Sequence, residues 1–474
     1  MTSIAPSELA ELANIDPSLI RVAHSGSIEA SRDYVLLWMQ RAQRADDNPA
    51  LECAVRAADL LKLPVLTLFV LTEYLSANFH HLEFMLGGLR ETAETIRSRG
   101  IAFCIRAGQP PDIVREFGAR AALIVGDEGR TAPELAWRRE LANCRDMPMI
   151  FFVETDAIVP PALACPKLAW SAAQLRGRIS AFLPHFLDRP EVSIAPRRGA
   201  AALGARSDDS LFEAARRGEE AELAAHPLLG LQRIDLEPGQ REGMRLFALF
   251  LEKKLQYYAE RRNDPNSGVQ SNMSPYLHFG QVSARSLARA ALDFHRERAQ
   301  AFIEELVVRR ELAINFVAYC PNYMQYESAV PAWARETLAA STRADAYARA
   351  GLEAGQSDDP YWNAAQLEMM LTGKMHNYMR MYWGKRILSW FRDPREAYAC
   401  AIELNDRYSL DGRDPNGYAG VAWCFGRHDR PWPRREAFGA VRSMTPEGLR
   451  RKFDADLYAE RIRSVYNARK AEVS

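Results

Sequence analysis

Short apolar runs alternate with amphipathic stretches over the first third of the chain. The apolar runs have the length and the Val, Ile, Leu and Phe content of buried strands, and they lie at 34–39, 64–71, 101–106, 122–128 and 149–156. The stretches between them carry apolar residues at helical spacing. Because strands that alternate with helices form parallel sheets, the pattern predicts a Rossmann-like α/β domain over 31–159, preceded by an N-terminal extension, 1–30.

The pattern changes after this region. Between 160 and 239, Ala, Gly, Arg and acidic residues dominate and little apolar periodicity remains, so we expect a long surface linker between two domains. From about 240 onward apolar residues recur at helical spacing, most clearly at 243–260, 301–320 and 365–391. This predicts a larger, all-α domain over 240–474.

Composition narrows the class of protein further. The 474 residues hold 61 basic and 61 acidic side chains, so a nucleic acid would have to be bound by a local basic cluster and not by a global positive field. Seven scattered cysteines without a CxxC pair argue against a disulfide framework and a zinc site, and we expect no metal. The chain has no signal-like start and no apolar stretch of membrane-spanning length, which predicts a soluble cytoplasmic protein.

The first candidate cluster lies in MHNYMRMYWGKRILSW, where Asn377, Arg380, Trp383 and Arg386 recur every three residues beside Met381. Polar groups that share a helix face with indole rings would need partners in a dry core, and a bound heteroaromatic ligand could supply them. The alternative is that the tryptophans simply fill the core of a large helical domain.

Two further clusters lack this regular spacing. SNMSPYLHFG begins with Ser271, Asn272 and Ser274, whose short side chains suit a helix start that either binds a phosphate or is simply capped. The segment 404–432, LNDRYSLDGRDPNGYAGVAWCFGRHDRPW, has almost no periodicity but is rich in Asn, Asp, Arg and Trp. This composition predicts a binding loop in which arginines and indoles hold a backbone phosphate beside an unstacked base, with a solvated surface loop as the alternative.

Together these clusters resemble the photolyase and cryptochrome family, and within it the class II cyclobutane pyrimidine dimer (CPD) photolyases. The strings that carry the resemblance are SNMSPYLHFGQVS, WNAAQLEMMLTGKMHNYMRMYWGKRILSW and LNDRYSLDGRDPNGYAGVAW, with WMQRAQRADDNPAL near the N-terminus. The resemblance implies an N-terminal antenna domain and a C-terminal domain that binds FAD, active as FADH⁻. It leaves open an antenna chromophore, of the 8-hydroxy-5-deazaflavin type or a folate or flavin.

The resemblance also implies roles for individual residues toward FAD. Those expected at the diphosphate and ribose are Tyr258, Ser271, Asn272 and Ser274, and those expected at the flavin are Asn377, Arg380, Asn405 and Asp411. Asn405 is expected beside flavin N5, because Gly417 occupies the place that other photolyases fill with asparagine. Arg380 is expected to pair with Asp411. The residues expected to carry electrons to oxidised flavin are Trp362, Trp383 and Trp390.

On the DNA side, the resemblance places Glu305 at the carbonyl edge of the pyrimidine dimer and Met381 and Trp423 against its rings. The residues expected to contact phosphates and the hole left by the flipped dimer are Arg262, Asn263, Arg430 and Trp432. One site departs from the family: Val308 and Arg309 stand where many photolyases have a second dimer-packing tryptophan. Arg309 is therefore expected to stack on a base or to pair with a carboxylate.

The expected function is light-dependent CPD repair, in which photoexcited FADH⁻ passes an electron to a flipped-out dimer and two carbon–carbon bonds break. The expected partner is damaged DNA, with no obligate protein partner and a monomeric chain. A cryptochrome-like blue-light receptor remains an alternative, as does a 6-4 photoproduct photolyase, which would want histidines such as His376 and His428 at the lesion. A dark flavoprotein oxidoreductase is disfavoured because no G-x-G-x-x-G follows the first strand.

Overall fold

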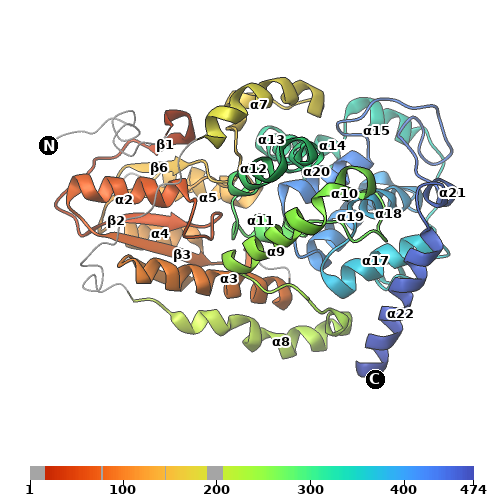
Figure 1. Cartoon of the computed structure of the whole chain (residues 1–474), viewed down its shortest axis with the longest axis horizontal. Coiled ribbons are helices and arrows are strands. Elements are labelled where there is room, and N and C mark those ends of the chain that lie inside the picture. The colour runs from red at the N-terminus through yellow and green to blue at the C-terminus, as the bar shows by residue number, and fades with distance from the viewer. Residues whose placement is uncertain (1–15, 76–77, 145, 189–205, 474) are drawn as a thin grey trace.

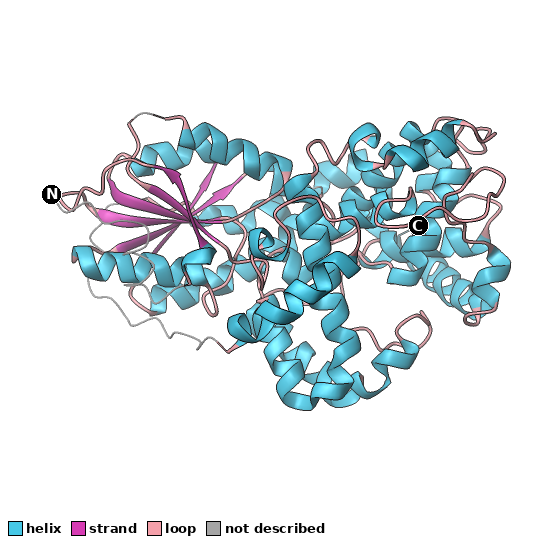
Figure 2. Cartoon of the chain, turned by 90° about the horizontal axis from the view of Figure 1, so that it is seen from above, coloured by secondary structure: helices cyan, strands magenta, loops and turns pink. Residues whose placement is uncertain are grey.

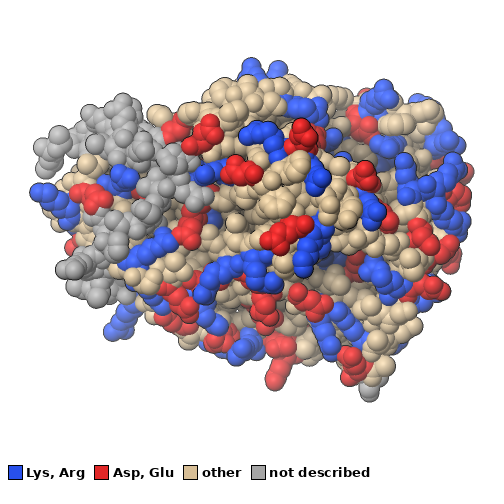
Figure 3. Space-filling view, in the orientation of Figure 1, with Lys and Arg blue, Asp and Glu red and all other residues tan. Residues whose placement is uncertain are grey.

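The computed structural model describes residues 16–75, 78–144, 146–188 and 206–473. An α/β part and a larger helical part lie side by side along the long axis of the molecule, with helix α22 (Ala455–Val473) at the end away from the sheet (Figure 1). Both predicted classes of structure are present, in the predicted order. The chain has 61 acidic and 61 basic residues, and the two kinds are interspersed over the face seen in Figure 3.

A six-stranded sheet forms the centre of the α/β part. Its strands are β1 (Ile20–His24), β2 (Tyr34–Met39), β3 (Val65–Leu71), β4 (Ala102–Ala107), β5 (Ala121–Asp127) and β6 (Ile150–Val153). The spatial order is β1-β6-β5-β2-β3-β4, and only the β1–β6 pair is antiparallel among the described strands. The main helices around it are α2 (Pro49–Leu61), α3 (Phe79–Ser98), α4 (Pro110–Gly118) and α5 (Ala132–Ala142), and helices lie on both faces (Figure 2).

The five predicted strands are confirmed. Every residue of β2 and β5 is buried, because helices cover both faces of the sheet, and this explains why these strands appear as unbroken apolar runs. Strand β1 corrects the prediction for 1–30, which is more than an extension, since Ile20–His24 adds an antiparallel edge strand. None of its five residues is fully buried, so it leaves no apolar run in the sequence.

The segment predicted as a linker, 160–239, is largely helical where the structure describes it. It contains α6 (Pro161–Ala164), α7 (Ala172–Leu187) and α8 (Ala214–Ala225), and α8 packs against α3 along the lower edge of Figure 1. Helix α8 buries only Ala215, so the apolar periodicity that would predict a helix is missing. Residues 189–205 lie outside the described part of the chain.

From α9 onward the helical part consists, where it is described, of helices and the loops that connect them. Its helices are α9 (Gln240–Lys253), α10 (Leu255–Arg261), α11 (Ser274–His278), α12 (Ala284–Ile303), a π-helix (Glu304–Arg309), α13 (Arg310–Tyr319), α14 (Tyr326–Ala329), α15 (Ala332–Ala339), α16 (Arg349–Glu353), α17 (Pro360–Thr372), α18 (Asn377–Ser389), α19 (Pro394–Tyr408), α20 (Pro415–Cys424), α21 (Pro446–Arg450) and α22. Among the described residues, no helix is both long and apolar enough to cross a membrane.

The segment 404–432 is not the irregular loop that its composition predicts. Its first residues complete α19, and 415–424 form α20. Seven of the ten residues of α20 are buried, and the other three, Asn416, Gly420 and Trp423, lie on one narrow face, so the segment has no broad polar face of the kind that marks a surface helix. Asn405 and Trp423 are held on helices, whereas Asp411, Arg430 and Trp432 lie in the turns between and after them.

The two parts of the molecule meet at the carboxyl ends of β2 and β5. The Asp127 carboxylate, at the end of β5, accepts hydrogen bonds of 2.7–3.2 Å from the backbone N–H groups of Gln40, Arg41 and Ala42. Gly280, at φ +66°, brings the backbone of the helical part against the Arg41 carbonyl, where a Cβ atom would collide. This point, where the strand order reverses, is thus occupied by contacts within the chain.

Candidate functional site

A cavity of about 490 Å³ opens in the helical part. Twelve of the residues singled out from the sequence line it: Arg262, Asn263, Ser271, Asn272, Ser274, Glu305, Arg309, Asn377, Arg380, Met381, Asp411 and Trp423. They come from stretches far apart in the sequence, namely the loop between α10 and α11, the π-helix, the start of α18 and the segment through α20. The fold therefore collects most of the predicted site residues in one place.

Local backbone structure aims these side chains. The π-helix presents Glu305 and Arg309 to the cavity. The side chain of Glu304, the residue before Glu305, is not part of the cavity lining and pairs with Arg176 of α7 at 2.8 Å. π-Helical turns are rare and are often found at functional sites. On α18, Asn377 and Arg380 line the cavity from the first turn.

Arg380 and Asp411 form the expected ion pair inside the cavity. Arg380 Nη2 lies 3.1 Å from Asp411 Oδ1, and the Ser409 hydroxyl donates to the same oxygen at 2.5 Å. Burial alone would raise the pKa of Asp411, but the charge of Arg380 and the hydroxyls of Ser409 and Ser274 hold it below its ordinary value. Within the described structure, Arg380 Nε is buried without a hydrogen-bond partner, so the pair retains a donor that a ligand could satisfy.

Asn405 lies behind the cavity wall and is not among the residues that line it. It is 2 % exposed, and its Nδ2 donates to Asp406 at 3.3 Å. A Cβ atom on Gly417 would stand only 2.9 Å from that Nδ2. The Asn405 amide thus packs against the backbone of Gly417, the position that other photolyases fill with asparagine.

At the cavity mouth Glu305 forms an ion pair with Arg262, and both side chains are about one-third exposed. The residue expected at the lesion and a residue expected at DNA phosphates are therefore coupled before any ligand binds. Tyr258 lies beside them but outside the cavity lining as described, with its ring edge-on to Phe250 at 5.6 Å and to Phe302 at 5.9 Å. Burial raises the pKa of Tyr258 to about 12.

The three tryptophans expected to carry electrons form one contiguous stack outside the cavity lining. Trp362 and Trp383 are parallel, with 6.4 Å between ring centroids, and Trp390 meets Trp362 edge-on at 5.0 Å. The middle ring, Trp362, is 0 % exposed, and the end rings, Trp383 and Trp390, are 1 % and 7 % exposed. The indole N–H of Trp383 donates to Gln366 at 2.9 Å, which fixes that ring.

Cations and indoles alternate from the cavity wall toward the surface. The buried ammonium of Lys385 lies 5.0 Å from the Trp423 ring, and Arg442 lies 5.9 Å from Trp423 and 4.8 Å from Trp432. Arg430 completes the row at 5.5 Å from Trp432. Arg430 and Trp432 are not in the cavity lining as described, but this row connects them to Trp423, which is.

The cavity also contains polar residues for which the sequence predicted no role in CPD repair: Gln270, Lys374, His376, Asn416 and His428. Burial lowers the pKa of Lys374 to about 8, and its ammonium contacts the Asn272 side chain. A buried lysine is rare unless it has a partner, so Lys374 within the otherwise apolar MMLTGKM was the available signal.

The two histidines of the lining differ in their hydrogen bonds: both ring nitrogens of His376 have a partner, whereas His428 Nε2 is buried without one in the described structure. His376 accepts a hydrogen bond from Tyr378 N–H at 3.2 Å, and its other ring nitrogen lies 2.8 Å from Gln270. His428 Nδ1 lies 3.2 Å from the Trp170 carbonyl. Burial lowers the pKa of each histidine to about 4, so both are neutral at physiological pH.

Comparison with known proteins places this arrangement in context. The family model described as DNA photolyase matches residues 35–162. The deoxyribodipyrimidine photo-lyase of Methanothermobacter thermautotrophicus is 42 % identical over 91 % of this chain and 95 % of that protein. The enzymes of the same name from Potorous tridactylus and Arabidopsis thaliana are 38 % and 35 % identical over 90 % and 98 % of this chain, and over 80 % and 96 % of their own lengths.

Solved structures agree on the fold. A class III photolyase from Agrobacterium tumefaciens aligns with a TM-score of 0.65 over 94 % of this chain and 99 % of that one, at 16 % identity. A photolyase from Sulfolobus tokodaii, solved with two FAD molecules, aligns with a TM-score of 0.67 over 91 % and 89 %, also at 16 % identity. With relatives this similar over nearly their whole length, the chain belongs to the DNA photolyase family, as an enzyme of the deoxyribodipyrimidine photo-lyase type.

Proposed function

We propose that this enzyme repairs CPDs in DNA, as a class II photolyase, by light-driven electron transfer from reduced FAD to a flipped-out dimer. The observation that carries the proposal is the single cavity that gathers residues expected at flavin, lesion and phosphate. Membership of the family supports the coarser statement that it acts on pyrimidine dimers in DNA.

The residues present fit FAD. The ammonium of Lys374 and the serine and asparagine side chains of 271–274 suit a diphosphate, and the spare Nε of Arg380 suits a polar edge of the flavin ring. We propose Asn377, Asp411 and Asn405 as further neighbours of the ring. When bound in its reduced form, FAD supplies the electron that breaks the dimer.

Toward the lesion, Glu305 would accept a hydrogen bond from the N3–H beside the pyrimidine carbonyl, and Arg262 would keep the carboxylate partly neutralised. Met381 and Trp423 offer apolar surface from a different side of the same cavity. The ammonium of Lys385 makes a cation–π contact with the Trp423 ring, so we expect the ring to need little reordering when a dimer binds.

Arg309 takes the place of the expected tryptophan. It lines the cavity, its side chain is half exposed, and it pairs with Glu304 at 3.1 Å. The second part of the expectation, pairing with a carboxylate, agrees with this contact. We propose that it also stacks on the flipped base or reaches a phosphate, because half of its side chain is exposed and it lines the cavity.

For activation of oxidised flavin, we propose electron flow along Trp383, Trp362 and Trp390, in the order of their contacts, with Trp390, the most exposed of the three, at the outer end. A 6-4 photoproduct photolyase is the second candidate, since His376 and His428 line the cavity. It is less well supported because both rings are neutral and both ring nitrogens of His376 already have partners, which leaves His428 Nε2 as the one ring nitrogen of the pair without a partner in the described structure.

A choice of lesions tests the proposal. Purified, photoreduced protein is given duplexes that carry either one CPD or one 6-4 photoproduct under blue light, with an undamaged duplex and darkness as controls. We expect light-dependent loss of the CPD alone. Loss of the 6-4 photoproduct alone would support the second candidate, and bound flavin without loss of either lesion would indicate a photoreceptor. The same preparation tests our expectations of a monomer, by its elution volume, and of an antenna chromophore, by extraction.

A further inference from the structure

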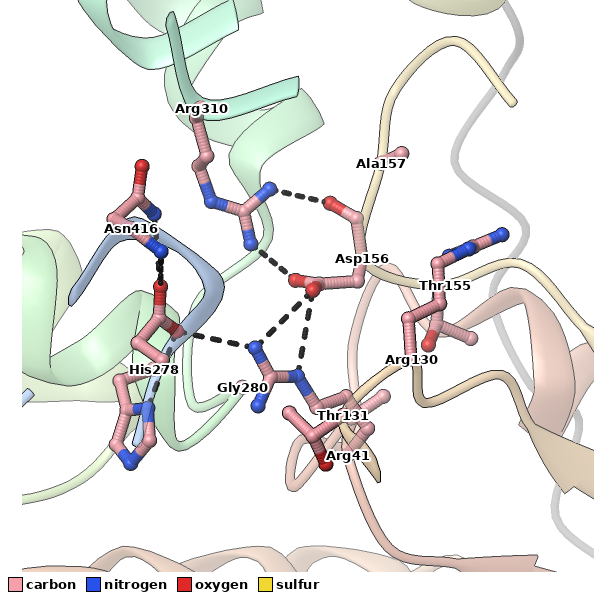
Figure 4. Close-up of polar contacts among 12 residues, drawn as sticks. Arg41, Arg130, Thr131, Thr155, Asp156, Ala157, His278, Gly280, Arg310 and Asn416 are labelled. Atoms are coloured by element: carbon pink, nitrogen blue, oxygen red, sulfur yellow. Dashed lines mark hydrogen bonds and ion pairs between the residues drawn. The ribbon is translucent and has the colours of Figure 1, made fainter. Parts of the chain in front are cut away.

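The walls of the cavity are tied to the α/β part by a buried network of charges. Arg41, which follows β2, lies between two carboxylates, with its Nη2 3.3 Å from Asp156 and 3.1 Å from Asp414 (Figure 4). Asp156 follows β6 and belongs to the α/β part, whereas Asp414 belongs to the helical part. All three side chains are at most 12 % exposed, so they depend on one another for charge compensation.

Asp414 uses its two oxygens for different tasks. Oδ1 caps α20 by accepting hydrogen bonds from the backbone N–H and the side-chain amide of Asn416, at 2.9 and 2.8 Å. Oδ2 is held by Arg41 and, at 3.2 Å, by His278 Nδ1. The start of α20 is thus oriented by a residue of the other part of the molecule, and this helix carries Asn416 and Trp423 into the cavity.

Asp156 extends the same network to the opposite wall. Its carboxylate pairs with Arg310, whose Nη1 also donates to the Asp156 carbonyl at 2.7 Å (Figure 4). Arg310 is the first residue of α13 and directly follows the π-helix that presents Glu305. One pair of residues from the α/β part therefore contacts the supports of both the Trp423 wall and the Glu305 wall.

The backbone of Arg41 is itself fixed. Its N–H donates to Asp127 at 2.8 Å, and its carbonyl lies against Gly280 of the helical part. The guanidinium consequently starts from an immobile point and spans two carboxylates that are immobile as well. Arg41 therefore does more than join the two parts, because it contacts Asp414, the residue that caps cavity helix α20.

We propose that Arg41 and Asp156 are positioning residues for dimer repair, which hold the two walls of the cavity at the separation that flavin and lesion require. The effect on dimer repair rests on the proposed function, but the contacts of Arg41 and Asp156 with the two cavity walls do not depend on it. It assigns to the α/β part a role in the geometry of the site in the helical part.

Arg44 provides a matched control. It is also buried, lies in the same loop after β2, and joins the two parts by donating to the carbonyls of Gly280 at 3.1 Å and Thr155 at 2.8 Å. It has no contact with α20 or α13 among the described hydrogen bonds and ion pairs. Arg41→Met and Arg44→Met should therefore both lower thermal stability, but only the first should disturb the cavity.

The test compares the FAD-loaded full-length variants by hydrogen exchange and by repair. In Arg41→Met we expect the α20 amides to exchange about tenfold faster or more, the effect of losing one charge-assisted hydrogen bond, and the repair rate at saturating dimer to fall. Arg41→Lys keeps a charge that cannot reach both carboxylates and serves if Arg41→Met does not fold, with a smaller effect in the same direction.

Two results would overturn the inference: unchanged exchange of α20 in the Arg41 variants, or an equal increase in Arg44→Met. If the unmodified protein repairs no dimers, the proposed function fails, while the exchange comparison still decides whether Arg41 positions α20.

Discussion

Asp411→Asn is the substitution whose consequences the structure defines most completely. It removes the charge that faces Arg380 and keeps the size of the side chain. The pair is about 14 % exposed, and removing one partner of a buried ion pair costs about 3 kcal/mol or more. Glu128→Gln is the control, because Glu128 is similarly buried in the α/β part and lies outside the cavity lining; it pairs with Arg138 at 2.9 Å and also with Arg21 and Arg130.

The same substitution should shift the flavin potential upward. A sphere of the cavity's volume, 490 Å³, is about 10 Å across, and at an effective dielectric constant of about 20 one charge acts over that distance with about 1.7 kcal/mol. Removing the negative charge of Asp411 favours the anionic reduced flavin by that amount. For a two-electron couple this corresponds to about 35 mV.

The assay is a spectroelectrochemical titration of bound flavin in the parent protein and both variants, with thermal melts alongside. We expect both variants to melt earlier and only Asp411→Asn to have a higher potential. A potential that is unchanged or lower in Asp411→Asn, or raised equally in Glu128→Gln, would refute the assignment of Arg380 and Asp411 to the flavin.

Three further predictions follow from other parts of the molecule. Burial raises the pKa of Glu311 to about 8 from an ordinary 4.5, so its stabilising contribution is present at low pH and is lost as pH rises toward 8, by at most about 1.4 kcal/mol per pH unit. The melting temperature of Glu311→Gln should therefore exceed that of the parent by a margin that grows between pH 6 and 8. A margin that stays constant with pH would contradict this. Trp362→Phe interrupts the tryptophan stack, so blue light should reduce oxidised flavin far more slowly while chemically reduced protein still repairs, whereas Trp333→Phe, outside the stack, should behave as the parent. Gly417→Ala places a Cβ 2.9 Å from Asn405 Nδ2 and should cost about 1–3 kcal/mol and weaken flavin binding, unlike Gly177→Ala, where the Cβ meets open space; equal flavin affinity in both variants would count against Asn405 as a flavin neighbour.

Much of the fold could be predicted because burial leaves a direct trace in sequence. Strands β2 and β5 are covered on both faces and therefore contain only buried residues, which gives an unbroken apolar run. Strand β1 has no such trace, since it lies at the sheet edge with no fully buried residue. Helix α20 is hidden for a different reason, because its only unburied face is the narrow stripe of Asn416, Gly420 and Trp423, which leaves no polar face by which a helix is recognised.

The site was predictable where long motifs carried it and not where single residues act through contacts. Asn377 and Arg380 lie in a distinctive string and are found in one cavity. The ion pair between Arg41 and Asp414 joins positions 373 residues apart, and the residues around each position do not indicate which partner it has. Pairing over such distances follows from how the two parts pack, which is settled only in the folded chain.

Light-dependent repair of a thymine-dimer oligonucleotide tests the central claim most directly, with Glu305→Gln beside Glu304→Gln. Glu304 is the neighbouring carboxylate on the same π-helix and is not part of the cavity lining; it pairs with Arg176 and Arg309, and glutamine keeps an acceptor oxygen for both. We predict repair by the photoreduced parent protein in blue light and none in darkness, a marked loss in Glu305→Gln, and near-parent repair in Glu304→Gln. Repair that needs no light, or that survives unchanged in Glu305→Gln, would contradict the account.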